Sequence, residues 1–385
     1  MQLTGYPREN GQVGIRNHVA VIASVTCANR VVEMIAAHVP GTVPIVHQHG
    51  CCQIGSDLEQ TVRTLIGFGQ NPNIAAVLVV GLGCESLQPK DLVAGIEVTG
   101  KPVTYITIQD EGGTLKAIAR GSAIVMDMVM NASQIQRQPI DISEIILGLE
   151  CGGSDTTSGL AANPATGFAS DLLVEAGGTA ILSETTELTG TEHVLAKRAK
   201  NAVVAKQIYE IVADVEKEAK RLGVDIRGGN PTPGNIEGGL TTIEEKSLGC
   251  IYKAGTSVIN EVIKYAEKPN EKGLVIMDTP GQDMESVTGM IAGGAQIVVF
   301  TTGRGTPTGS PITPVVKVCG NPRTVKTMVD NIDIDASTII TGHKTIEAVG
   351  REIFAEYLQA INGKLTKSEI LGHREFGICR IAMSV

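Results

Sequence analysis

The first third of the chain alternates short, uninterrupted apolar runs with longer amphipathic stretches, and this alternation strongly limits the folds open to it. Apolar runs that are rich in β-branched residues and lack polar alternation predict strands buried on both faces. Where helices separate such strands, they form a parallel sheet covered on both sides. The predicted strands are Val19–Val25, Val43–His47, Ile74–Val80 and Val103–Ile106. The predicted helices are Asn29–His38, Ser56–Gly69, Lys90–Gly100 and Gly112–Asn131.

A polar segment, Ser133–Pro139, interrupts this alternation before a new predicted strand, Glu144–Leu149. We therefore expect an N-terminal α/β domain over residues 1–135 and a C-terminal α/β domain over residues 140–385. The expected fold class is α/β, with parallel, doubly wound (Rossmann-like) sheets in two domains.

The C-terminal domain continues the α/β pattern with one interruption. The glycines and prolines of residues 227–239 predict an ordered loop or a mobile lid, because they are too dense for a helix or strand. The further predicted strands are Thr179–Ser183, Gly273–Met277, Gln296–Thr301 and Val315–Val318. The further predicted helices are Thr166–Ala176, Glu192–Leu222, Glu285–Ala292, Arg323–Val329 and Thr345–Asn362.

Composition excludes several classes of partner. The formal net charge is −9, and the aromatic residues are only 5 Phe and 6 Tyr, with no Trp. Nucleic acid is therefore not an expected partner, because it needs basic surface and stacking platforms. No apolar stretch approaches the roughly 18 residues that cross a bilayer, and no secretory signal is present, so we expect a cytoplasmic protein without membrane segments. The 8 cysteines are then expected to be thiols or metal ligands rather than disulfides.

Four of these cysteines follow predicted strands. Cys27, Cys51 and Cys84 belong to the N-terminal domain, and Cys151 belongs to the C-terminal one. Because the carboxyl ends of parallel strands meet at the ligand-binding edge of a sheet, the four thiols could converge. Each of them could instead be a small buried apolar side chain, which is the usual fate of a free cysteine.

Three of the four thiols have neighbours suited to metal or acid–base chemistry. Thiolate ligands favour iron or zinc over magnesium or calcium, but the spacing of these residues does not choose a metal because no close CxxC pair occurs. The imidazole of His47 could serve as a ligand or as an acid–base group. The three segments are His47-Gln48-His49-Gly50-Cys51-Cys52-Gln53, Gly81-Leu82-Gly83-Cys84-Glu85 and Glu150-Cys151-Gly152-Gly153-Ser154-Asp155.

Two further segments are suited to hold a carboxylate. One is Asn163-Pro164, which opens a helix, and the other is Gly303-Arg304-Gly305-Thr306-Pro307, which follows a strand. Arg304 could equally form an interdomain salt bridge, and the loop around Asn235 could be purely structural. A dinucleotide fingerprint is weak because Ser86 replaces its third glycine, and no phosphate loop or serine nucleophile elbow occurs.

Ordered motifs run along nearly the whole chain. They are Gly5-Tyr6-Pro7-Arg8, Val13-Gly14-Ile15-Arg16-Asn17, Gly81-Leu82-Gly83-Cys84-Glu85, Gln109-Asp110, Cys151-Gly152-Gly153-Ser154-Asp155, Ala162-Asn163-Pro164, Pro233-Gly234-Asn235, Glu245-Lys246-Ser247-Leu248-Gly249 and Thr302-Gly303-Arg304-Gly305-Thr306-Pro307. Together these motifs resemble the altronate/galactarate dehydratase family of sugar-acid hydro-lyases.

The resemblance implies the large catalytic subunit of an oligomeric enzyme whose small partner is a SAF-domain (small antifreeze-like) subunit. It implies removal of a proton α to a carboxylate and then loss of a β substituent, which yields a 2-keto acid. The leaving group is water from a sugar acid such as altronate, or sulfite in (2R)-sulfolactate sulfo-lyase relatives. The implied cofactor is mononuclear Fe²⁺ or an iron–sulfur cluster, and the sequence leaves that choice open.

The resemblance also suggests roles for particular residues. The metal ligands are Cys51, Cys84 and Cys151. The acid–base candidates are His47, Glu85, Asp110 and Asp155. The candidates that bind the small acidic substrate are Asn163, Asn235, Arg304 and Thr306.

Two departures from the family pattern weaken a long sugar acid as substrate. Ile236-Glu237 stands where many sugar-acid members have Lys, and Thr308 stands where Tyr is common. An alternative of another class is a non-catalytic ligand-binding subunit that holds structural zinc. A nicotinamide dehydrogenase is disfavoured by the missing glycine fingerprint.

Overall fold

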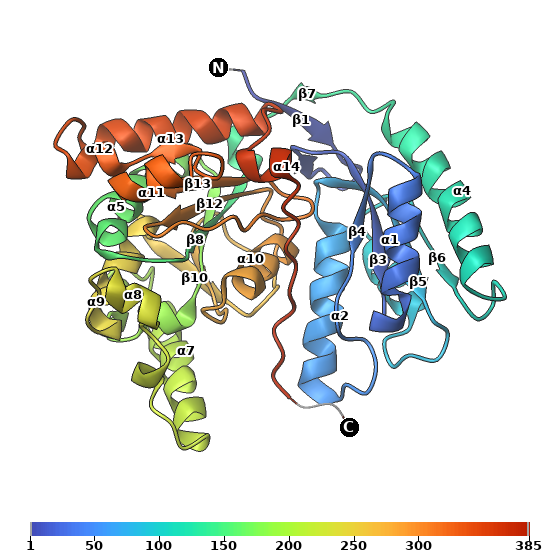
Figure 1. The fold of residues 1–385 in the computed structure, drawn as a ribbon, viewed down its shortest axis with the longest axis horizontal. Coiled ribbons are helices and arrows are strands. Elements are labelled where there is room, and N and C mark those ends of the chain that lie inside the picture. The colour runs from blue at the N-terminus through green and yellow to red at the C-terminus, as the bar shows by residue number, and fades with distance from the viewer. Residues whose placement is uncertain (1, 383–384) are drawn as a thin grey trace.

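In the computed structural model, which describes residues 2–382 and 385, two parallel sheets lie in neighbouring halves of the molecule (Figure 1). The first half contains a four-stranded sheet of order β4-β3-β5-β6. Its strands are β3 (His18–Ala23), β4 (Thr42–Ile45), β5 (Ile74–Gly81) and β6 (Val103–Thr107). Its helices are α1 (Asn29–His38), α2 (Gly55–Gln70), α3 (Pro89–Glu97) and α4 (Thr114–Ala132). The α/β class with parallel sheets is confirmed, and every element predicted for this half is present.

The two faces of the first sheet bury alternate residues of its central strands. Val19 and Val21 of β3 pack toward α1 and α4, whereas Ala20 and Ile22 pack toward α2 and α3. Side chains of a strand alternate between faces, so a sheet that has helices on both sides needs apolar residues at every position. This requirement explains the uninterrupted apolar runs of the sequence.

The second half contains a seven-stranded parallel sheet of order β10-β11-β9-β8-β12-β13-β14. Its strands are β8 (Ile146–Cys151), β9 (Thr179–Leu182), β10 (Ile259–Ile263), β11 (Gly273–Met277), β12 (Ile297–Thr302), β13 (Val315–Cys319) and β14 (Ile334–Asp335). Its helices are α5 (Asn163–Glu175), α6 (Glu192–Ala196), α7 (Ala202–Arg221), α8 (Pro233–Glu237), α9 (Ile243–Cys250), α10 (Asp283–Ala292), α11 (Pro322–Thr327), α12 (Ser337–Ile340), α13 (Ile346–Ile361) and α14 (Lys367–Leu371).

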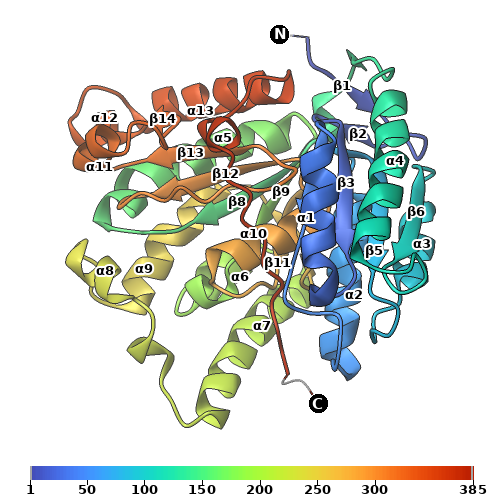
Figure 2. The same ribbon diagram turned by 45° about the vertical axis from the view of Figure 1, so that its right-hand side comes forward.

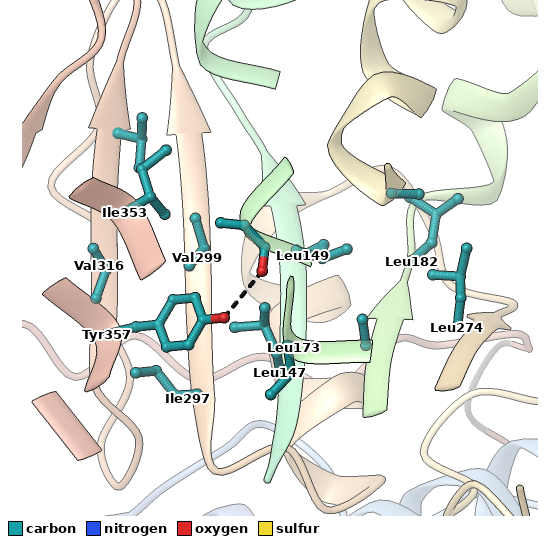
Figure 3. Close-up of a cluster of buried hydrophobic side chains, with 14 of the residues drawn as sticks. Leu147, Leu149, Leu173, Leu182, Leu274, Ile297, Val299, Val316, Ile353 and Tyr357 are labelled. Carbon is teal, nitrogen blue, oxygen red and sulfur yellow. Dashed lines mark hydrogen bonds between the residues drawn. The ribbon is translucent and has the colours of Figure 1, made fainter. Parts of the chain in front are cut away.

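One face of this sheet packs against α5, α7 and α13 in a single apolar cluster (Figure 3). Tyr357 of α13 is fully buried there, and its hydroxyl donates a hydrogen bond of 3.0 Å to the carbonyl oxygen of Ala169 in α5. Leu149 and Val299 meet the same cluster from β8 and β12. The opposite face packs against α10, which also contacts α2, so apolar packing continues between the two halves.

The structure corrects two predictions for the second half. The predicted helix Glu192–Leu222 is two helices, because residues 197–201 leave the helical path and Lys200 donates a backbone hydrogen bond to Ile259. Asn201 then caps α7 with its side chain. The segment 227–239 contains a short helix, α8, in which Pro233 occupies the first turn and Thr232 caps the helix.

Two connections hold the halves together. A small antiparallel sheet joins β1 (Thr4–Pro7) to β2 (Val13–Gly14) and β7 (Gln138–Pro139), and the backbone amide of Thr4 donates a hydrogen bond of 2.8 Å to Asn362 Oδ1 in the second half. The C-terminal segment runs past α10 toward α2 (Figure 2), where Gln60 donates a hydrogen bond of 2.8 Å to the carbonyl oxygen of Cys379. Among the described residues, no helix is both long enough and apolar enough to cross a membrane.

Candidate functional site

A cavity of about 230 Å³ lies at the carboxyl end of β8, the central strand of the seven-stranded sheet. Cys151 ends the strand, and a π-helical turn, Ser158–Ala162, leads into α5 and places Asn163 at the cavity wall. Helix α9 closes the other side with Lys246 and Cys250. The carboxyl edge of a parallel sheet is the common ligand site of α/β proteins, and π-helical turns are frequent at functional sites.

Cys151 sits in a strongly polar environment. Its backbone N–H donates a hydrogen bond of 3.0 Å to Glu184 Oε2, and its Sγ lies 3.0 Å from Ser154 Oγ and 3.7 Å from Asn163 Nδ2. A hydrogen bond from Cys250 lowers the pKa of Cys151 to about 6, against the opposing effect of burial. Burial raises the pKa of Cys250 well above its ordinary value. At neutral pH the cavity therefore presents Cys151 as a thiolate and Cys250 as a thiol.

Next to this cavity, buried carboxylates outnumber the ammonium groups that neutralise them. Lys253 Nζ donates to Glu184 Oε2 at 2.7 Å and to Cys250 Sγ at 2.6 Å, and both charged side chains of the Lys253–Glu184 pair are 0% exposed. Lys246 Nζ lies 2.5 Å from Glu187 Oε1. The acids in this cluster are Glu150, Glu184, Glu187 and Asp283.

Three carboxylate oxygens of this acid cluster are buried without a hydrogen-bond partner: Glu150 Oε1, Glu184 Oε1 and Glu187 Oε2. Burial raises the pKa of Glu150 to about 8, of Asp283 to about 6 and of Glu184 well above its ordinary value. Gly152 makes room for Asp283, since a Cβ at this glycine would lie 2.2 Å from Asp283 Oδ2. Buried oxygens left unpaired in this way are costly, and a cation satisfies them.

Two overlapping groups in the cluster have ligand atoms that all lie within 4.8 Å of one another. They are Glu184, Glu187 and Cys250, and Glu150, Glu184 and Asp283. Oxygen donors with one sulfur suit a divalent first-row metal such as Fe²⁺. The donor set and its unpaired oxygens therefore fit the metal that the sequence led us to expect, but at residues that differ from the predicted ligands.

Metal binding at the acid cluster should depend on pH. Glu150 keeps its proton in the folded protein up to about pH 8 and loses it in the unfolded chain near its ordinary value of 4.5. The metal-free protein should therefore lose stability as pH rises through this window, whereas metal affinity rises because binding displaces protons. We expect the increase in Tm on adding Fe²⁺ or Mn²⁺ under argon to be larger at pH 8 than at pH 6. An equal increase at both values would contradict protonated ligands.

The predicted N-terminal acid–base residues are engaged in hydrogen bonds. Burial lowers the pKa of His47 to about 4, and both ring nitrogens have partners, with Nε2 2.7 Å from the Ala23 carbonyl oxygen and Nδ1 accepting from the His49 amide at 3.1 Å. Glu85 accepts hydrogen bonds from Ser24 Oγ and from two backbone amides, which lower its pKa against the effect of burial. Both side chains therefore position loops in this structure.

The remaining N-terminal candidates lie at the surface. Asp110 is exposed and accepts a hydrogen bond from Thr107. Cys51 and Cys84 are also exposed, whereas Cys151 is buried in the second half. Among the described residues, the sulfurs of Cys51, Cys84 and Cys151 do not form a group within 4.8 Å, so the predicted shared site for one ion is not assembled here.

The predicted substrate-binding residues lie around Asp155, which separates two cavities. Asp155 lines the cavity at Cys151 and also a second cavity of about 470 Å³ that contains Arg304. Arg304 Nη2 contacts Glu237 Oε2 at 2.8 Å in an exposed ion pair. Asn235 donates a hydrogen bond of 2.8 Å to the carbonyl oxygen of Ser154 and so supports the cavity wall.

Other predicted contacts are internal to the protein. Both Asp155 oxygens accept hydrogen bonds, from Thr157 at 2.8 Å and from Asn321 at 2.7 Å. Asn163 Nδ2 donates 3.0 Å to the Gly249 carbonyl. Thr306 Oγ1 lies 2.9 Å from Thr308 Oγ1. Asp155 and Asn163 thus shape the site, and Thr306 is turned toward its own loop.

Sequence reasoning assigned no role to Glu184, Glu187, Lys246, Cys250 or Lys253. Lys246 lay in a recognised motif, Glu245-Lys246-Ser247-Leu248-Gly249, which was the one available signal. Glu184 and Glu187 lie near Lys246 because they belong to the turn that follows β9, and β9 is hydrogen-bonded to β8. No short-range pattern marks such a cluster.

The fold and the site define an α/β protein with a cavity at the carboxyl edge of a parallel sheet that is lined in part by charged side chains. Residues 5–133 match the model of the D-galactarate dehydratase/altronate hydrolase second domain, and residues 142–384 match that of the D-galactarate/altronate dehydratase C-terminal region. The chain therefore belongs to the D-galactarate/altronate dehydratase family, and it is a lyase.

Three relatives illustrate the range of this family. The (2R)-sulfolactate sulfo-lyase subunit beta of Chromohalobacter salexigens is 42% identical, over 98% of this chain and 97% of its own. Altronate dehydratase of Bacillus subtilis is 35% identical, over 99% of this chain and 78% of its own. Galactarate dehydratase (L-threo-forming) of Escherichia coli is 37% identical, over 94% of this chain and 72% of its own.

Proposed function

We propose that this protein removes a β substituent from a small 2-hydroxy acid in the cavity at the end of β8. The observation that carries the proposal is the pairing of the Cys151 thiolate and the Lys246 ammonium with an acid cluster that has three unpaired oxygens. The family's lyase chemistry needs a base, a cation for developing negative charge and a Lewis acid. The first two requirements are met by Cys151 and Lys246 at the cavity, and the third by the acid cluster beside it, which contacts them through Glu184 and Glu187.

Each group has a distinct part in the proposed mechanism. Cys151 Sγ accepts the proton α to the substrate carboxylate, because its pKa of about 6 keeps it basic at neutral pH. Lys246 holds its ammonium at the cavity wall through Glu187 and Asn230, where it stabilises the enolate as negative charge develops. Fe²⁺, when bound by Glu184 and its neighbours, supplies Lewis acidity toward the carboxylate or the leaving group.

We favour a short sulfonated acid that loses sulfite as the substrate. The name of the Chromohalobacter salexigens relative describes a sulfo-lyase that acts on (2R)-sulfolactate. The match covers almost the full length of both chains, and a cavity of about 230 Å³ suits a small ligand. The second candidate is loss of water from a sugar acid, which the two dehydratase relatives support at 35% and 37% identity. In either case we propose a small SAF-domain subunit as partner.

A single assay separates these candidates. The chain is purified under argon, loaded with Fe²⁺, mixed with the small subunit encoded beside it and supplied with sulfolactate, altronate or galactarate. Release of sulfite with pyruvate supports the sulfo-lyase, and a 2-keto acid from altronate or galactarate supports the hydro-lyase. Tightly bound zinc with no turnover of any of the three acids would instead support a non-catalytic subunit.

Replacing Arg304 by Lys should lower kcat/KM by roughly 10- to 150-fold, equivalent to about 1.5–3 kcal/mol. Arg304 lines the neighbouring cavity on the other side of Asp155, and the proposal requires the substrate to extend into it. There the guanidinium can hold a carboxylate or sulfonate through two hydrogen bonds, which an ammonium cannot reproduce. Because its present partner, Glu237, is 72% exposed, the ion pair can open to admit a substrate. Tm and metal content should stay near wild type. Unchanged kinetics would mean that Arg304 serves only its pair with Glu237.

A further inference from the structure

Three cysteines stand at the carboxyl edge of the four-stranded sheet, away from the cavity at β8. Strands β4, β3 and β5 are neighbours in this sheet, and Cys51, Cys27 and Cys84 lie on the loops that directly follow them. All three are exposed, although free cysteines are among the residues most often buried. Three exposed thiols on adjacent loops therefore call for a functional explanation.

The loops that carry these thiols are held against one another. The amide of Thr26, next to Cys27, donates a hydrogen bond of 2.9 Å to the His49 carbonyl. The amide of Leu87 donates 3.0 Å to the Gly50 carbonyl, which ties the loop of Cys84 to the same segment. Gly50 allows this close approach, since its φ is +103° and a Cβ there would lie 2.1 Å from a backbone oxygen of Ser24. The three loops thus form one preorganised surface.

The same surface offers further ligand atoms. Cys52 adjoins Cys51 with 3.8 Å between their sulfurs, and its φ of 56° is unusual for a residue other than glycine. The Nδ1 atom of His49 is buried without a hydrogen-bond partner. In the described part of the chain, these atoms do not form a group of three within 4.8 Å, so they are spaced too widely for one metal ion.

We propose that Cys27, Cys84 and one thiolate of the Cys51–Cys52 pair bind an iron–sulfur cluster at this edge. A cluster accepts thiolates that are farther apart than a single ion does, because each sulfur binds a different iron. Three thiolates leave one iron of a [4Fe–4S] cluster without a thiolate from this set. The site replaces Cys151 of the predicted ligand set by Cys27, and it does not depend on the proposed lyase reaction.

The test uses the full chain, purified under argon and reconstituted with sulfide and equal amounts of Fe²⁺ and Fe³⁺, which together supply the mixed oxidation state of the cluster. Wild type should bind about four sulfide per chain, with about four iron in addition to any Fe²⁺ held by the acid cluster, and acquire the visible absorption of a [4Fe–4S] cluster. Cys27→Ser, Cys84→Ser and the double variant Cys51→Ser/Cys52→Ser should each lose most of the sulfide and the absorption. Cys319→Ser, a buried cysteine of the other half, is the matched control and should keep both.

Thiol labelling provides a second readout that does not depend on variants. Reconstitution should protect Cys27 and Cys84 from alkylation, as read by mass spectrometry of the native chain, and should leave the reactivity of Cys379 unchanged. Absence of sulfide from reconstituted wild type, or alkylation of Cys27 and Cys84 at the unreconstituted rate, would overturn the proposal. Because neither readout uses turnover, failure here leaves the lyase assignment standing, and an inactive chain with a cluster leaves this inference standing.

Discussion

Replacing Lys253 by Met should lower the free energy of unfolding of the metal-free protein by about 3–5 kcal/mol, the cost of breaking a buried ion pair. Lys253 and Glu184 are both 0% exposed, with 2.7 Å between Nζ and Oε2, so water cannot replace the lost ammonium. Met fills a similar volume, and the loss therefore reports charge rather than a cavity. Urea unfolding followed by circular dichroism measures it.

The loss should grow with pH and should be partly reversed by a second substitution. Without Lys253, Glu184 is an unpaired buried carboxylate, which is neutral only when it binds a proton. Burial already raises the pKa of Glu184 well above its ordinary value, so the protonated form is favoured at low pH and the stability loss is smaller there. The double variant Lys253→Met/Glu184→Gln should thus be more stable than Lys253→Met alone at pH 8. Lys200→Met, which breaks a half-exposed pair with Glu271, is the control and should cost no more than about 1 kcal/mol. A similar loss in both single variants would argue against the special cost of burial.

The fold could be predicted because its signal is local. The two central strands of the first sheet, β3 and β5, are almost continuous apolar runs. Short runs of this kind predict strands that are buried on both faces. The predictions that missed depended on partners distant in sequence. The break before α7 exists because Lys200 pairs with Ile259 of β10, an edge strand whose polar residues Asn260 and Glu261 hid it from the apolar pattern.

The site could be predicted only in part for the same reason. Cys151, Asp155 and Asn163 line the cavity, and the sequence singles them out because they lie at or just after the end of β8, and parallel topology places strand ends at one edge. The sequence placed Cys51 and Cys84 in one domain and Cys151 in the other, but it carried no information on how far apart the edges of the two sheets lie. A joint site of these three thiols therefore depends on contacts between residues distant in sequence. Glu184 and Lys253 escaped notice because buried charges are recognisable only from the groups that surround them.

Replacing Lys246 by Gln should lower kcat by roughly 10²–10³-fold, the usual cost of removing one preorganised group that stabilises a developing anion. The lysine is 9% exposed, and attraction from Glu187 raises its pKa against the effect of burial, so it stays an ammonium throughout the neutral range. It is therefore suited to stabilise negative charge and unsuited to accept a proton, whereas the Cys151 thiolate has the opposite character. Steady-state kinetics of the Fe²⁺-loaded protein measure the loss.

Glu187 provides the means to separate catalysis from structure. Lys246→Gln alone leaves this carboxylate without its 2.5 Å partner, so part of any activity loss could come from a weakened fold or an altered metal site. The double variant Lys246→Gln/Glu187→Gln removes both charges and should recover Tm without recovering kcat. Because Glu187 belongs to one of the two metal-binding groups, iron content is measured in parallel, and Glu187→Gln alone shows how much of the loss is due to the metal. Recovery of kcat in the double variant would show that Lys246 is only the counterion of Glu187 and that the enolate is stabilised by another group.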